Sequence, residues 1–101
     1  FGDALTALEA FVYANPDSAD GWNYIGFVSR KLEKYEDAER YYSLGLEINP
    51  LHKGILEYQG ELYLKTNRID KARENLSILN DLCNFNCSYR DKLREKIKNN
   101  N

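Results

Sequence analysis

The side chains in this sequence that point most directly to catalysis or metal binding are His52, Cys83 and Cys87. A catalytic thiol needs a nearby base and a further group that orients that base. His52 could serve either cysteine as the base, but the sequence offers no third member and no oxyanion site. It also has no Gly-rich phosphate loop and no serine in a Gly-x-Ser-x-Gly setting. We therefore expect no enzyme activity, no cofactor and no metal.

The spacing of Cys83 and Cys87 leaves three interpretations open. They could be two small, buried, unbonded side chains at a helix end. They could form a disulfide across a turn, because residues four apart lie near the Cα separation of about 5.5–6 Å that disulfides prefer. They could bind a metal with His52, although zinc prefers four ligands. We favour the disulfide. It would raise the free energy of unfolding by about 2 kcal/mol and would indicate an oxidising compartment.

The composition predicts a small all-α domain. The 101 residues include 14 basic and 16 acidic side chains, and no apolar run is long enough to span a membrane. Proline and glycine are few, and helix-forming residues dominate. Residues 90–98 hold five basic and two acidic residues, which fits a solvated terminal helix better than a docking segment. We expect no nucleic-acid partner, since this patch is small and mixed with acids.

Two segments of the chain align without gaps at an offset of 34 residues. Trp22 falls on Leu56, Gly26 on Gly60, and Ala38 on Ala72. Stepping back by the same offset places Pro16 on Pro50 and Phe1 on Tyr35. A fixed period of this length is typical of stacked helical repeats. We predict one domain, 1–101, containing the second half of a repeat at 1–16, full repeats at 19–52 and 53–86, and a capping helix at 88–99.

Each repeat predicts a pair of antiparallel helices. The segments 20–32 and 35–48 carry apolar and small residues at helical spacing. Asn15–Pro16 and Asn49–Pro50 each end a helix, because a residue before proline is displaced from the α region, and Asp17 or Ser18 can cap the next one. Gly26 is expected where two helices approach closely, with large side chains such as Tyr42 beside it.

These residues resemble the tetratricopeptide repeat family, whose pattern is a bulky residue, an aliphatic residue followed by Gly, and later Tyr, Ala, an aromatic, Ala and Pro. The turn positions Glu33 and Asn67 depart from the family, which usually has Gly there. The resemblance implies helix pairs stacked in a right-handed superhelix, closed by a solvating C-terminal helix, and a scaffold for protein–protein interaction. The first copy carries it at Trp22, Ile25, Gly26, Tyr35, Ala38, Tyr42, Gly45, Leu46 and Pro50, and the second at Leu56, Gln59, Gly60, Tyr63, Ile69, Ala72, Leu76 and Leu79.

The segment 82–87 is also similar to a turn found in small exported bacterial tetratricopeptide repeat proteins. Asn86 stands where that turn usually has Gly. This resemblance implies a periplasmic or secreted location and favours the disulfide between Cys83 and Cys87. Without it, the expected location is the cytoplasm.

The resemblance implies that a peptide or protein partner binds in a concave groove lined by the first helix of each pair. Glu57 and Glu61 would repel a C-terminal carboxylate, so we reject the carboxylate clamp used by chaperone-binding members of the family. A peptide with both apolar and charged residues fits the groove better. The groove positions are Asn23, Tyr24, Phe27, Arg30, Lys31, Glu57, Tyr58, Glu61, Leu64 and Lys65.

A structural role is the competing prediction. The first half-repeat leaves one side of its helix open, and this side carries Phe1, Leu5, Leu8 and Phe11. Two copies of the chain could bury these side chains against each other in a homodimer. A molecular mass that depends on concentration would distinguish this role from capture of a different protein.

Overall fold

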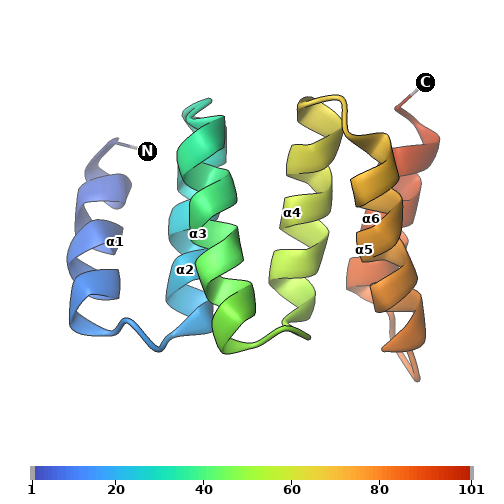
Figure 1. Ribbon diagram of the computed structural model, residues 1–101, viewed down its shortest axis with the longest axis horizontal. Coiled ribbons are helices and arrows are strands. Elements are labelled where there is room, and N and C mark those ends of the chain that lie inside the picture. Colours follow the sequence, from blue (N-terminus) through green and yellow to red (C-terminus); the bar gives the residue numbers. More distant parts are fainter. Residues whose placement is uncertain (1, 101) are drawn as a thin grey trace. The chain divides into compact units, whose positions relative to one another are not determined.

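The computed structural model of the chain describes residues 2–100, which form six helices and no strand. It divides into two compact units, residues 1–52 and residues 53–101. Consecutive helices within each unit run antiparallel (Figure 1). The predicted all-α class is confirmed over the described residues, whereas the right-handed superhelix stays a prediction. Across the same residues, no helix has the length and apolar character needed to cross a bilayer.

The first unit consists of α1 (Gly2–Ala14), α2 (Ala19–Lys31) and α3 (Tyr35–Ile48). Helices α1 and α3 end directly before the Asn–Pro pairs, as the sequence predicts. The Ser18 hydroxyl caps α2 by accepting a hydrogen bond from the Gly21 amide at 3.1 Å. Local signals therefore set the helix boundaries of this unit.

The second unit consists of α4 (Lys53–Lys65), α5 (Ile69–Asp81) and α6 (Ser88–Lys98). Helix α6 packs against both α4 and α5, which is the position of a capping helix. Its Leu93 is completely buried, while Tyr89 is still 41% exposed. The predicted terminal helix is thus present, and its apolar stripe covers the preceding pair mainly through Leu93.

Two helices end in the same left-handed turn without a glycine. Glu33 and Asn67, which replace the usual turn glycine, have φ angles of 62° and 60°. The amide of the next residue donates back to a carbonyl in each case, Lys34 to Ser29 at 2.8 Å and Arg68 to Tyr63 at 2.7 Å. This hydrogen-bond pattern closes the end of a helix and is usually built on glycine. The turn geometry is preserved although the residue that best tolerates it is missing.

Small residues let the helices of each unit approach closely. A Cβ added to Gly26 would lie 2.5 Å from the Tyr42 ring, and one added to Gly21 would lie 2.8 Å from the Phe11 ring. The predicted contact between Gly26 and Tyr42 is confirmed. In the second unit the equivalent Gly60 faces Leu93 of α6, 2.7 Å from its added Cβ.

One buried polar pair explains a departure from the repeat pattern in the second unit. Gln59, which stands where the family has an aliphatic residue, is 5% exposed, and Asn75 is 7% exposed. The Asn75 amide donates to the Gln59 side chain at 2.8 Å and to the Leu56 carbonyl at 3.0 Å. Each amide thereby gains the partner that a buried polar group requires, and the pair ties α5 to α4.

Candidate partner-binding surfaces

The exposed side of α2 carries an aromatic and cationic stripe. Tyr24 is 58% exposed, Phe27 is half-buried, and Lys31 is exposed. Their spacing of three and four residues places them on one face of the helix. The Phe27 ring lies 5.6 Å from the Arg30 guanidinium carbon and 5.4 Å from the Lys31 ammonium nitrogen. We call Tyr24, Phe27 and Lys31 the α2 stripe.

Helix α4 repeats part of this arrangement 34 residues later. Tyr58 is half-buried and Lys65 is exposed, at the positions equivalent to Tyr24 and Lys31. Between them, the Glu61 side chain is 9% exposed, and its carboxylate forms an ion pair with the Lys96 ammonium of α6 at 3.0 Å. We call Tyr58 and Lys65 the α4 stripe; its accessible charge is that of the lysine.

Half of the predicted groove positions offer little surface to a partner. The exposed fraction is 2% for Glu57, and it lies between 7% and 9% for four further positions, two of which are the acidic Glu61 and the cationic Arg30. The sequence expectation of a groove with exposed charges of both signs is therefore corrected, because its acidic side chains and one of its cations are inside the protein. These five positions are Asn23, Arg30, Glu57, Glu61 and Leu64.

Cys83 and Cys87 form a disulfide, with a Cα separation of 5.6 Å. This confirms the disulfide, which was the favoured one of the three interpretations, and excludes free thiols. A metal site made of both cysteines and His52 is also wrong, because disulfide sulfurs are not thiolate ligands. No group of three or more metal-ligating side chains occurs in residues 2–100. The bridge closes a short loop between α5 and α6, and Phe85 at its tip is 91% exposed.

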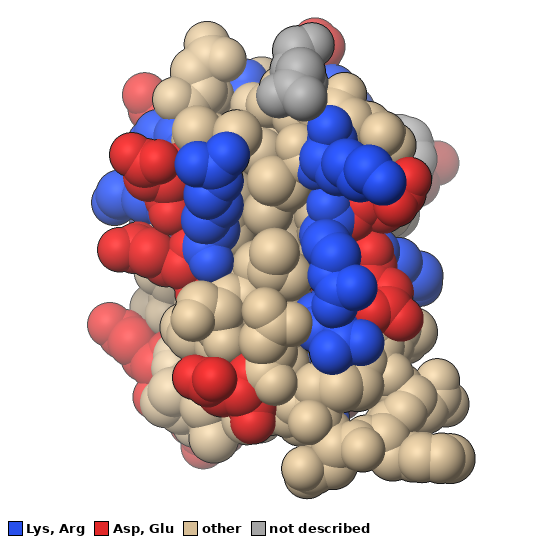
Figure 2. Space-filling model, turned by 90° about the vertical axis from the view of Figure 1, so that its right-hand side faces the viewer, with Lys and Arg blue, Asp and Glu red and all other residues tan. Residues whose placement is uncertain are grey.

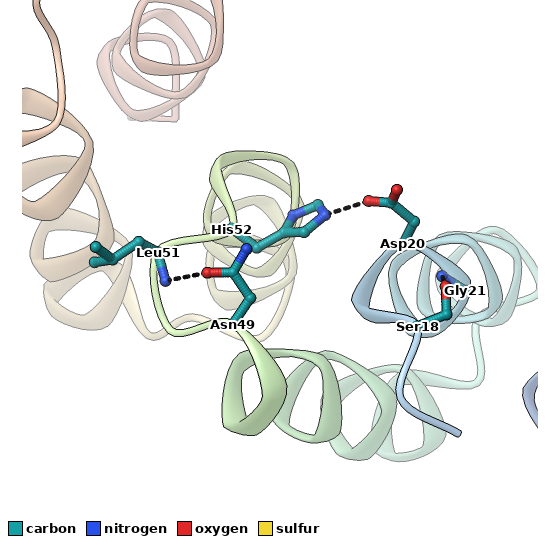
Figure 3. A network of polar contacts seen from close by, with 6 residues as sticks. All are labelled: Ser18, Asp20, Gly21, Asn49, Leu51 and His52. Carbon is teal, nitrogen blue, oxygen red and sulfur yellow. Dashed lines mark hydrogen bonds and ion pairs between the residues drawn. The ribbon is translucent and has the colours of Figure 1, made fainter. Parts of the chain in front are cut away.

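His52 takes part in a polar contact within the first unit (Figure 3). Its Nε2 atom lies 2.6 Å from a carboxylate oxygen of Asp20, in the first turn of α2. Nearby, the Asn49 side chain accepts a hydrogen bond from the Leu51 amide at 3.1 Å. The contact between His52 and Asp20 ties the segment after α3 to the start of α2.

The basic residues of α6 are largely engaged with neighbouring acids. Arg90 and Arg94 lie 3.0 and 3.8 Å from Asp91, and Lys96 pairs with Glu61. Figure 2 shows basic side chains in columns on both sides of an uncharged strip on this face of the second unit, with acidic side chains beside them. The mixture of charges supports the interpretation of α6 as a solvated terminal helix.

The predicted self-association face lies on α1. Leu5 and Leu8 are half-buried, and Phe11 is 45% exposed although its ring contacts Gly21. Phe1 lies outside the described residues. A partly open apolar side is thus present on α1, but part of it already packs against α2 of the same chain.

The sequence did not predict a cavity of about 310 Å³ between α1, α2 and α3. Its lining includes three aromatic side chains: Tyr13, Trp22 and Tyr41. Trp22 is also the bulky position of the repeat pattern, so the sequence alone does not mark it as the wall of a cavity. In the folded unit Trp22 and Tyr41 are both partly exposed.

Residues 19–52 match the family model described as Tetratricopeptide repeat. The chain carries a tetratricopeptide repeat. A comparison with curated proteins finds no match. The matched segment covers α2, α3 and the turn that ends at His52, within the first unit. The repeat makes this protein a protein–protein interaction module in general terms, with proteins as its partners. The disulfide is compatible with an oxidising, extracellular location.

Proposed function

We propose that this tetratricopeptide repeat protein is a non-catalytic module that binds a peptide segment, and that the α2 stripe of the first unit and the α4 stripe of the second unit each offer a contact surface for it, at positions that the family resemblance assigns to a binding groove. The observation that carries the proposal is the exposure of Tyr24. A tyrosine that is 58% exposed on the first helix of the repeat presents a large rigid ring to a partner. Tyrosine is enriched among the residues that dominate binding energy.

The burial of the acidic groove positions narrows the chemistry of the ligand. Lys31 and Lys65 are the exposed charges on the two stripes, and both follow a tyrosine by seven residues. A partner with apolar side chains for the tyrosines and acidic side chains for the lysines complements them. We therefore propose an acidic, partly apolar peptide in place of the mixed-charge peptide that the sequence suggests.

The non-catalytic part of the proposal rests on how the reactive side chains are used. Cys83 and Cys87 are bonded to each other, and one ring nitrogen of His52 contacts Asp20. The Ser18 hydroxyl serves as the cap of α2. A hydrolytic activity that survives purification and is lost in His52→Ala would overturn this part.

An affinity capture from a lysate of the source organism, with three forms of the chain as bait, tests the binding proposal. The wild-type chain is compared with the Tyr24→Ala, Tyr58→Ala double variant, both shown to be folded by circular dichroism. Tyr89→Ala is the matched control, because it removes an exposed tyrosine from α6 instead. A partner retained by wild type and by Tyr89→Ala but lost by the double variant supports the proposal. Equal capture by all three places binding elsewhere.

Self-association through α1 is the second candidate function, and the 45% exposure of Phe11 favours it. Two copies that bury Leu5, Leu8 and Phe11 would form a dimer with the same patch on both chains. Analytical ultracentrifugation over a range of concentrations tests it. A mass that rises with concentration in wild type and stays monomeric in Leu5→Glu supports the dimer, and a concentration-independent monomer contradicts it.

A further inference from the structure

The cavity of the first unit has an apolar floor that is already shaped. Val12 of α1 and Ile25 of α2 are 3% and 0% exposed, and both line the cavity with the half-buried Leu44 of α3. A volume of about 310 Å³ is at the lower end of the range of small-molecule sites and accommodates a large side chain. The cavity is formed entirely by one compact unit.

The aromatic wall of the cavity, formed by Trp22 and Tyr41, is held in place by a hydrogen bond and a stacking contact within the protein. The Trp22 indole N–H donates to the Pro16 carbonyl at 2.8 Å. The Trp22 ring stacks on Tyr41, with centroids 5.8 Å apart and an interplanar angle of 26°. Because the indole N–H is satisfied, the rings offer apolar surface to an occupant. Rings that are fixed beforehand lose little freedom on binding.

Two opposite charges stand on different sides of the cavity. Glu9 comes from α1 and is exposed, and it forms no hydrogen bond or ion pair within residues 2–100. Arg40 comes from α3, with a side chain that is 61% exposed; it lies 3.4 Å from Asp37 and 5.1 Å from the Tyr41 ring centroid. An occupant that extends toward α1 would meet a carboxylate, and one that extends toward α3 would meet a guanidinium.

We propose that this cavity is a second peptide-binding site, which takes one large apolar side chain of a protein partner flanked by a basic residue on the Glu9 side and an acidic residue on the Arg40 side. The apolar floor and stacked rings receive the side chain, and the two charges fix its direction. An alkylammonium group also favours aromatic rings. Arg40 opposes it, because this like charge already lies over the Tyr41 ring.

The site is separate from the proposed α2 stripe. Successive residues of a helix are about 100° apart, so Trp22 and Ile25 lie on nearly the opposite side of α2 from Tyr24, Phe27 and Lys31. The two surfaces can therefore be occupied independently. Variants in one surface leave the other surface intact.

Trp22 is the only tryptophan of the chain and lines the cavity, so its fluorescence reports occupancy directly. We would titrate the chain with a capped peptide that has a central leucine, lysines at one end and aspartates at the other, and with the reverse-order peptide. A peptide with serine in place of the leucine, and tetramethylammonium chloride, serve as comparison probes. The protein variants are Tyr13→Ala, Glu9→Gln and, as matched control, Tyr24→Ala.

We expect a saturable change in Trp22 emission with one of the two leucine peptides, a weaker response to the leucine peptide of the opposite order, and none with the serine peptide. Tyr13 is 82% exposed, so its removal leaves the core intact. Tyr13→Ala should weaken binding about tenfold, as loss of an aromatic contact does, and Glu9→Gln about threefold. Tyr24→Ala should bind like wild type. Equal responses to the leucine and serine peptides, no response to either leucine peptide, or a tetramethylammonium response that Glu9→Gln abolishes would each overturn the proposal.

Discussion

Replacing Gly26 by alanine should destabilise the first unit, although the same change stabilises most helices. Alanine is favoured over glycine within a helix by about 1 kcal/mol. At Gly26, however, the new Cβ would lie 2.5 and 2.7 Å from two carbons of the Tyr42 ring. Favourable carbon–carbon contacts are about 3.5–4.0 Å, and Tyr42 is fully buried, so its ring has little room to move.

The magnitude follows from these two opposing effects. Overpacking of a well-packed core costs about 1–3 kcal/mol. Because the new Cβ is fixed to the backbone and the Tyr42 ring is fully buried, the strain belongs at the upper end of this range, about 2–3 kcal/mol. Subtracting the helix preference of alanine, about 1 kcal/mol, leaves a loss of about 1–2 kcal/mol in the free energy of unfolding. Urea unfolding, monitored by the emission of Trp22 in the same helix, measures this loss.

Two comparison variants test the explanation. Gly2→Ala has no atom within 4 Å of the added Cβ and should be neutral or slightly stabilising. Tyr42→Leu combined with Gly26→Ala should destabilise by less than the sum of the two single variants, because the smaller side chain removes the overlap. If Gly26→Ala alone is more stable than wild type, the close approach of α2 and α3 at this point is wrong.

The remaining predictions concern a turn, the bridge and the terminal helix. Glu33→Gly should stabilise the first unit by about 1 kcal/mol, since Glu33 has a φ of 62°; thermal unfolding measures it, and Lys34→Gly, one residue later, should not stabilise. Replacing Cys83 and Cys87 together by serine should cost about 2 kcal/mol in urea unfolding, and a reducing agent should affect only the wild type. Leu93→Ala should lower the free energy of unfolding by about 2–5 kcal/mol, because Leu93 is completely buried against Gly60. Hydrogen exchange should then show that α6 opens before the other helices. Unchanged protection of the α6 amides would contradict the prediction that α6 is held on the second unit by Leu93.

The sequence by itself determined the helices and their ends. Asn–Pro pairs stop α1 and α3, and Ser18 caps α2, because these signals act on the backbone of a few neighbouring residues. The 34-residue offset likewise indicates the repeat, since equivalent helices need equivalent packing residues. The pairing of Cys83 with Cys87 was only favoured, because spacing alone does not separate a bridge from two thiols.

Only the tertiary structure decided which side chains reach the surface. The family resemblance assigns Tyr24 and Arg30 alike to the groove, yet the first is 58% exposed and the second 8%. The repeat offset likewise places Leu76 at the position of Tyr42, whereas Gly60 faces Leu93 of the terminal helix. Exposure and contact depend on which neighbouring helices cover a face and how closely they approach. Those distances are set by residues far apart in the chain, and no local pattern encodes them.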